Sequence, residues 1–227
     1  MNNSTGNAGR VLWAGLRALL VLTLVCGVLY PLAVTGVAQV AFPAKANGSE
    51  IKDGSGKVVG SELIGQRYDL PPKDGEETAA PDLKWFQPRP SNGLGGNTVN
   101  TRYKLLVSGA TNRSGDNADL IAWVKDAKAA VVRDNSTPGH PVRPEDVPAD
   151  AVTSSGSGLD PHISSEYAQL QVRRVAERNG LDAAKVEQLV ADHTDGRIAG
   201  FIGEPRVNVL QLNIALRDLV GKELTKS

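Results

Sequence analysis

The sequence predicts an α+β extracytoplasmic domain carried on a single N-terminal transmembrane helix. Residues 18–41 form a run of 24 positions without a charged side chain, which exceeds the ~20 apolar residues that cross a bilayer as a helix. Residues 43–117 are rich in turn-forming residues and offer short strand candidates, whereas the rest of the chain shows helical periodicity. We therefore expect a short cytoplasmic tail over 1–14, an anchor helix over 15–38 and a soluble domain over 39–227.

The apolar run is interpreted as an uncleaved anchor. A cleaved signal peptide is the alternative, because Ala44 and Ala46 resemble a cleavage site. However, the apolar region of a signal peptide usually spans only ~7–15 residues. Trp13 stands at one end of the run and Tyr30 and Phe42 toward the other, where aromatic side chains favour the membrane interface.

The orientation of the anchor is read from its flanking charges. Arg10 and Arg17 precede the run, and the first 49 residues contain no acid. Three lysines follow it, interleaved with acidic residues. Because the two arginines lie close to the first helix, we favour a cytoplasmic N-terminus in a bacterial inner membrane, with the domain outside.

Small, kinking or polar residues recur at every fourth position of the anchor, at Gly27, Pro31, Thr35 and Gln39. At 3.6 residues per turn they form one slowly drifting face. Such faces mediate helix–helix contacts in lipid, because they allow close approach and amide pairing. A lone anchor that tolerates these residues is the alternative.

The domain's elements are predicted from periodicity and capping signals. The first half is expected to hold a strand over 62–68, a polar loop over 69–82 and a Gly/Asn/Ser region over 91–117. A helix follows from about Leu120 to Val131, and residues 134–148 read as a loop. Ser164 or Ser165 begins the next helix, which ends at Gly180; Asp182 and Asn208 cap two more, and 198–202 is a strand candidate.

Composition excludes several classes of function. Lys and Arg number 25 against 25 Asp and Glu, and this balance disfavours nucleic-acid binding. A single cysteine leaves no disulfide framework. The three histidines, His140, His162 and His193, show no ligand spacing, so a metal site is not favoured.

The most unusual segment is 152–164, VTSSGSGLDPHIS, which leads toward a helix. A Gly/Ser loop before a helix N-terminus is able to present backbone N–H groups to phosphate. We therefore take as a candidate nucleotide site Ser154, Ser155, Gly156, Ser157 and Gly158. The alternative is a capping loop in which Asp160 forms an Asx turn. A triad fragment of Asp160 and His162 is disfavoured, because Ser157 lacks the G-x-S-x-G context.

Two further segments are candidates for partner docking. Trp85, Phe86 and Arg89 place aromatic rings beside a guanidinium in a Pro-restrained segment, and such residues dominate interface hot spots. Glu204 and Arg206 flank Pro205, where a desolvated ion pair would suit a docking turn. In both segments a clasp internal to the fold is the alternative.

Several motifs together give the chain a close resemblance to a known family over nearly its whole length. The motifs are YPLAVTGVAQVAFP (30–43), GSELIGQ (60–66), QPRPS (87–91), VTSSGSGLDPHIS (152–164) and HTDGRIAGFIGEPRVNVLQLN (193–213). The chain resembles the C subunits of Kdp-type potassium-transporting ATPases.

The resemblance implies a non-catalytic, single-span subunit of an ATP-driven potassium import complex. It implies as partners a channel-like potassium-translocating subunit, a P-type ATP-hydrolysing subunit and a small stabilising membrane peptide. The subunit would support assembly and raise the ATP affinity of the hydrolysing subunit, with Ser154–Gly158 as the nucleotide contact and no tightly bound cofactor. An outward domain conflicts with direct ATP contact, because ATP is scarce outside the cell. A stand-alone anchored hydrolase using Ser157 or His162 is the alternative class.

Overall fold

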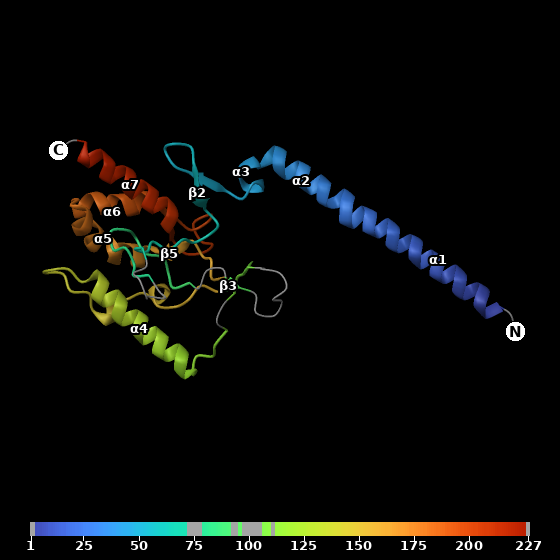
Figure 1. The fold of residues 1–227 in the computed structure, drawn as a ribbon, viewed down its shortest axis with the longest axis horizontal. Coiled ribbons are helices and arrows are strands. Elements are labelled where there is room, and N and C mark those ends of the chain that lie inside the picture. The colour runs from blue at the N-terminus through green and yellow to red at the C-terminus, as the bar shows by residue number, and fades with distance from the viewer. Residues whose placement is uncertain (1–2, 72–78, 92–94, 97–105, 110–111, 226–227) are drawn as a thin grey trace. The chain divides into compact units, whose positions relative to one another are not determined.

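The computed structural model describes residues 3–71, 79–91, 95–96, 106–109 and 112–225. The chain divides into two compact units, Met1–Glu50 and Ile51–Ser227. The first unit is helical and the second combines helices with short strands (Figure 1). The predicted α+β class on one apolar N-terminal helix is confirmed.

The N-terminal unit is one long helix with a widened turn in its middle. It comprises α1 (Asn3–Leu24), the π-helical turn η1 (Val25–Leu29) and α2 (Tyr30–Ala41), and the short α3 (Pro43–Ala46) follows. The N–H of Tyr30 donates to the carbonyl of Val25, five residues back. Pro31 comes next and has no N–H, and its ring would crowd the carbonyl of Gly27 in a regular helix. The wider turn gives that ring room.

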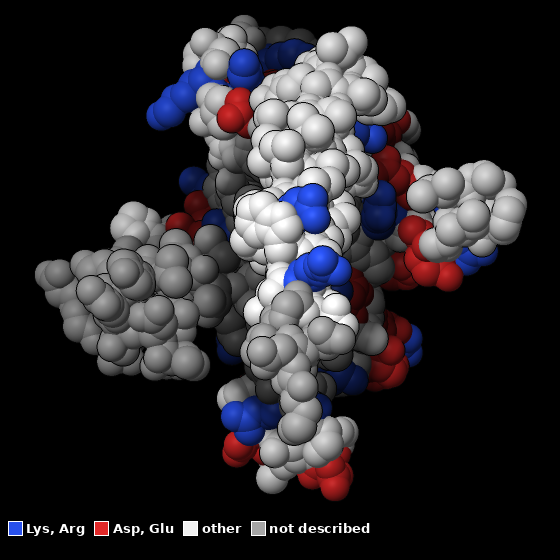
Figure 2. All heavy atoms as spheres, turned by 90° about the vertical axis from the view of Figure 1, so that its right-hand side faces the viewer, with Lys and Arg blue, Asp and Glu red and all other residues white. Residues whose placement is uncertain are grey.

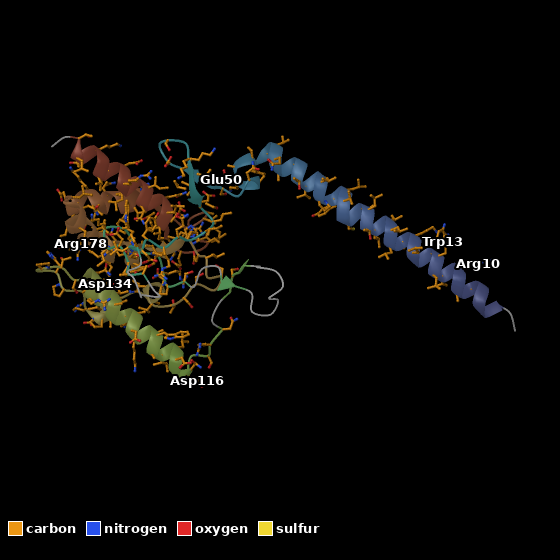
Figure 3. The ribbon with its side chains drawn as sticks, viewed as in Figure 1. Arg10, Trp13, Glu50, Asp116, Asp134 and Arg178 are labelled. Atoms are coloured by element: carbon orange, nitrogen blue, oxygen red, sulfur yellow. The ribbon has the colours of Figure 1, made fainter. Side chains whose placement is uncertain are left out.

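Residues Asn7–Ala41 are helical over 35 positions and are long and apolar enough to cross a membrane. At 1.5 Å per residue the stretch measures about 52 Å, against a hydrocarbon core of about 30 Å. Figure 2 shows its surface as white, interrupted by blue basic spheres and by no red acidic ones among the described residues. Trp13 and Arg10 project from its N-terminal part (Figure 3), and the Arg17 guanidinium lies 5.6 Å from the Trp13 ring centre.

In the described part of the domain there are four α-helices, and each begins at a side-chain cap. They are α4 (Ala118–Asn135), α5 (Ser165–Asn179), α6 (Ala183–Asp192) and α7 (Val209–Leu224). Ser164, Asp182 and Asn208 accept a hydrogen bond from the first turn of their helices, as predicted. Gly180 ends α5 with φ 65°, the left-handed conformation that a glycine adopts without strain. Asp116 and Asp134 mark the two ends of α4 (Figure 3).

A small antiparallel sheet in the order β5-β7-β6 feeds two of these helices. The strands are β5 (His162–Ser164), β6 (Thr194–Asp195) and β7 (Arg206–Asn208). His162 pairs with Asn208 and Ser164 with Arg206, while Asp195 lies opposite Arg206 on the other side. Because β5 runs directly into α5 and β7 into α7, the strands fix where both helices begin.

The remaining strands and turns lie in the loop-rich first half and around the Pro-rich connection. The short elements are β1 (Glu50–Lys52), β2 (Val58–Ser61), β3 (Gly95–Gly96), β4 (Leu106–Val107) and the 3-10 turns η2 (Pro144–Asp146) and η3 (Ala149–Ala151). Strand β1 pairs with β2, and β3 pairs with β4. The expected loop over 69–82 is closed by a bridge between Asp69 and Pro81, and its residues 72–78 lie outside the described part.

Two predicted strands are wrong. The chain turns at 62–64 because the Ser61 hydroxyl and carbonyl accept the N–H groups of Leu63 and Ile64. Residues 198–202 close on themselves, with Ile198 and Ile202 paired only to each other. A left-handed backbone at Ala199 and Gly200 reverses the chain there, so the apolar run does not extend.

The core lies around α5, which packs against α4 and α6. Val172, Val175 and Ala168 are almost fully buried on its inner face. Other buried members come from the flanking elements: Ile163, Val186, Val190, Val207, Leu212 and Leu216. This apolar interior, supplied by several elements, fixes the positions of the polar groups described next.

Candidate functional site

An open cleft of about 590 Å³ brings together three residues predicted to dock a partner, Arg89, Glu204 and Arg206, and is also lined by Asp160 and His162. Strands β5 and β7 and the first turn of α5 form part of its lining. The two segments predicted to dock a partner therefore meet at one place, together with the end of the segment 152–164, whereas Ser154–Gly158 do not line the cleft. This cleft is the candidate functional site.

Arg89 and Asp160 form the centre of the cleft. The Arg89 Nη1 lies 3.0 Å from the Asp160 Oδ2, and both side chains are mostly shielded from solvent. The same guanidinium donates to the carbonyl of Thr153. Pro88 and Pro90 restrict the backbone on either side of Arg89. Arg89 thus ties the segment before the Gly/Ser loop to the turn after it.

His162 lies beside this pair on β5. Its Nδ1 is 3.5 Å from the Asp160 Oδ1, and its backbone N–H donates to the same oxygen at 3.0 Å. The second contact closes the Asx turn that the sequence offered as the alternative. Burial, with the nearby positive charge of Arg206, lowers the pKa of His162. The imidazole is therefore neutral at neutral pH.

The N-terminus of α5 already holds a carboxylate. The Asp150 side chain accepts hydrogen bonds from the Ser164 N–H at 2.7 Å and from its hydroxyl at 2.8 Å. A negative group at a helix N-terminus is stabilised by unpaired N–H groups and the helix dipole. Asp150 thus lies where a phosphate would bind at α5. The Gly/Ser loop does not lead directly into this helix, because β5 lies between them.

The Gly/Ser loop is closed largely by its own hydrogen bonds. The Ser155 hydroxyl, which is buried, accepts from the Asp160 N–H, and the Ser157 hydroxyl accepts from the Leu159 N–H. The Ser155 N–H donates to the carbonyl of Pro90. Gly156 and Ser157 are exposed. These bonds are those of a capping loop, and nucleotide contact by Ser154–Gly158 stays a prediction.

The predicted desolvated pair of Glu204 and Arg206 is not formed. Glu204 pairs with Arg197 at 2.7 Å, and Arg206 lies 3.9 Å from Asp195. Pro205 directs the two side chains into different pairs. All four of these side chains are substantially exposed in the chain by itself.

The aromatic segment is a strap, defined as residues 83–87, that is held between α5 and α7 by hydrogen bonds from both helices. Phe86 is fully buried within the chain, so the prediction that its side chain docks a partner is wrong. The Asn213 amide accepts from the Phe86 N–H and donates to its carbonyl, both at 2.9 Å. The Gln171 amide does the same for Gln87 at 2.7 and 3.1 Å. Trp85 is half-buried and lies against Tyr68, with ring centres 5.7 Å apart.

Arg174 completes this support. It donates to the carbonyls of Leu83 and Trp85, to the Asn135 side chain at 2.9 Å and to the Gln171 side chain at 2.6 Å. Its burial lowers its pKa to about 10. Gln171, Arg174 and Asn213 were not among the residues predicted from the sequence. Their one signal is that they are polar residues on the apolar faces of their helices.

The four residues of the predicted anchor face, Gly27, Pro31, Thr35 and Gln39, are exposed in the chain by itself. The Gln39 and Asn47 amides bind each other at 3.2 and 3.3 Å. Contact of this face with another helix stays a prediction.

The chemistry available to the cleft is charge pairing and hydrogen bonding. Over the described residues, no group of three His, Cys, Asp or Glu side chains is arranged to hold a metal. Ser157 bonds with Ser155 and Leu159, while His162 lies beside Asp160. The alternative of a hydrolase therefore gains no support from this geometry.

Together, these features define a membrane protein with one apolar N-terminal helix and an α+β domain whose predicted site residues largely bind one another. The family model for "K+-transporting ATPase, c chain" matches residues 12–218. The chain is 74% identical to the potassium-transporting ATPase KdpC subunit of Streptomyces avermitilis over 97% of its own length and 99% of the relative. The corresponding subunit of Streptomyces coelicolor is 72% identical (97% and 98%), and that of Geobacter metallireducens 42% (87% and 92%). The chain belongs to the family of K+-transporting ATPase c chains.

Proposed function

We propose that this chain is an accessory subunit of an ATP-driven potassium import complex, needed for assembly and stability of that complex. Its partners would be a channel-like potassium-translocating subunit, a P-type ATP-hydrolysing subunit and a small membrane peptide. The observation that carries the proposal is that the charged groups of the candidate site are taken up in contacts within the domain. Arg89 binds Asp160 and Thr153, and Asp150 caps α5, which suits positioning rather than a reaction.

The anchor supports the same role. Its exposed face of Gly27, Pro31, Thr35 and Gln39 would pack against helices of the companion subunits, because small residues allow backbones to approach closely in lipid. A Cβ atom added at Gly27 would meet only the Thr23 Cγ2 atom, at an ordinary contact distance of 3.9 Å. A larger residue there would leave the chain itself unstrained and disturb only a neighbouring helix.

The test is co-purification of the complex with anchor variants. We expect Gly27→Ile with Thr35→Ile to release the companion subunits and abolish potassium-stimulated ATP hydrolysis. Ala33→Ile with Val37→Ile, which adds bulk to the opposite face of the same helix, is the matched control and should leave the complex intact. An unchanged complex in the first variant would refute the proposed anchor contact.

We further propose that the domain lies outside the cytoplasm, and that any increase in ATP affinity is transmitted through the companion subunits. Ser157 is exposed, so a cysteine placed there in a Cys26→Ala background reports its location. Labelling of intact cells by a membrane-impermeant thiol reagent is the expected result. Labelling only after lysis would reverse the orientation and favour direct ATP contact by Ser154–Gly158.

A further inference from the structure

The connection between β6 and β7 carries an exposed apolar loop, residues 198–202. Ile198, Phe201 and Ile202 are 64, 75 and 52% exposed. Large apolar side chains gathered at one exposed place usually mark an interaction site. The cleft described above is lined by Glu204 and Arg206 of this connection but not by residues 198–202.

The loop is held in one conformation. The N–H of Ile198 donates to the carbonyl of Ile202 at 2.9 Å, and the N–H of Ile202 donates back at 3.0 Å. Arg197 and Glu204, which flank the loop on its two sides in the sequence, form an ion pair at 2.7 Å. A loop whose backbone is already fixed loses little conformational freedom on binding, and this raises affinity.

The loop also contains a backbone conformation that its sequence disfavours. Ala199 has φ 53°, in the left-handed region, next to Gly200 at 83°. A non-glycine residue there costs about 1–2 kcal/mol. Backbone strain of this kind persists where the surroundings impose it, and it is concentrated at functional sites. Here it turns Phe201 outward instead of allowing a regular strand.

The charges around the loop indicate what it binds. Arg197 pairs with Glu204, and Arg206 lies near Asp195. The residues that flank the loop therefore carry no excess of positive charge. Insertion into an anionic bilayer is favoured by excess Lys and Arg near the surface. An exposed apolar loop of fixed conformation, with equal numbers of positive and negative charges around it, fits a pocket on another protein. The residues that dominate binding energy at protein interfaces are often aromatic side chains that fill such pockets.

We propose that the loop 198–202 binds in an apolar pocket on a companion subunit of the potassium-transporting ATPase, with the Phe201 side chain as the main contact. This inference rests on the proposed function, because it identifies a contact within the complex that the subunit helps to assemble. The recognised surface would be a concave apolar patch with a polar rim.

The first experiment places the photo-crosslinker p-benzoylphenylalanine at Phe201 in the complete complex. Illumination and mass spectrometry should yield a crosslink to a companion subunit. A crosslink to lipid would show membrane insertion, and one to a second copy of this chain would show self-association; both would overturn the proposal, as would no crosslink. The same probe at Ile121, exposed on α4, controls for non-specific capture.

The second experiment measures affinity. We expect Phe201→Ser to weaken binding of the purified chain to the companion subunits by about 30-fold or more, the effect of losing a hot-spot residue. Ile121→Ser should change it less than twofold. Both positions are exposed, so the melting temperatures should match that of the wild type. If wild type itself fails to bind the companions, the proposed function fails; if wild type and Phe201→Ser bind equally, only the loop contact fails.

Discussion

Asn213→Leu tests whether a single side chain supports the strap at its buried residue, Phe86. Leucine has a similar size but offers no hydrogen bonds. The Phe86 N–H and carbonyl, both bound by the Asn213 amide at 2.9 Å, would then be left unpaired in the interior. Each orphaned buried group costs about 1–3 kcal/mol, which gives about 2–6 kcal/mol for the two. Because the added apolar burial offsets part of this loss, we expect about 3 kcal/mol of destabilisation.

The assay is thermal unfolding of the full chain in detergent. Trp85 fluorescence reports on the strap when Trp13 and Trp123 are replaced by Phe. At about 2–4 °C per kcal/mol for a domain of this size, the melting temperature should fall by about 6–12 °C.

Asn179→Leu is the matched control, because Asn179 donates to the carbonyl of Lys84 in the same strap. Lys84 is exposed, and water replaces the lost donor, so a change below about 1 kcal/mol is expected. If the two Leu variants melt alike, the account of the strap is wrong. Asn213→Asp adds a second check: only its protonated form both donates and accepts, so its stability should fall as pH rises.

Two further predictions concern the candidate site. The pKa of folded His162 is below its ordinary value of 6.5, so the unfolded state binds more protons as pH falls through this range and stability decreases. His162→Gln should reduce that acid-induced loss in melting experiments at pH 7.5 and 5, and equal losses in both proteins would refute the cause. Gly65→Ala would place a methyl group 2.5 Å from the carbonyl oxygen of Asp160 and should cost about 1–3 kcal/mol of unfolding free energy. Gly156→Ala, with open space at the same atom, should be close to neutral, and similar melting temperatures for both variants would contradict the argument.

The elements that the sequence predicted depend on neighbouring residues. A cap is a contact between residues two or three positions apart, so Ser164, Asp182 and Asn208 were identifiable from the sequence alone. The same holds for Gly180, whose role requires only a left-handed backbone at the end of α5. The apolar anchor is also a local signal, because its length alone meets the requirement for a span.

The features that were missed depend on distant residues. Phe86 and Asn213 are 127 positions apart, and no pattern in either segment indicates that one supports the other. The run 198–202 has the composition of a strand, but Ala199 adopts a conformation that a sequence pattern does not encode. Glu204 and Arg206 were expected to pair with each other, but each lies closest to a charged residue earlier in the β6–β7 region, Arg197 and Asp195 respectively.

The cleft, the apolar loop and the strap are connected through β7. No strand of the central sheet is longer than three residues, so the sheet alone does not fix the domain. The position of β7 is set by α7, which follows it directly and bears Asn213, the residue that holds the strap. The loop with Phe201 precedes β7, and Glu204 and Arg206 line the cleft. A partner that binds this loop would therefore contact a segment that continues into β7 and α7, and α7 is packed in the core. Such an arrangement suits a subunit that positions other proteins, because the binding loop is connected to the buried hydrogen bonds between Asn213 and Phe86.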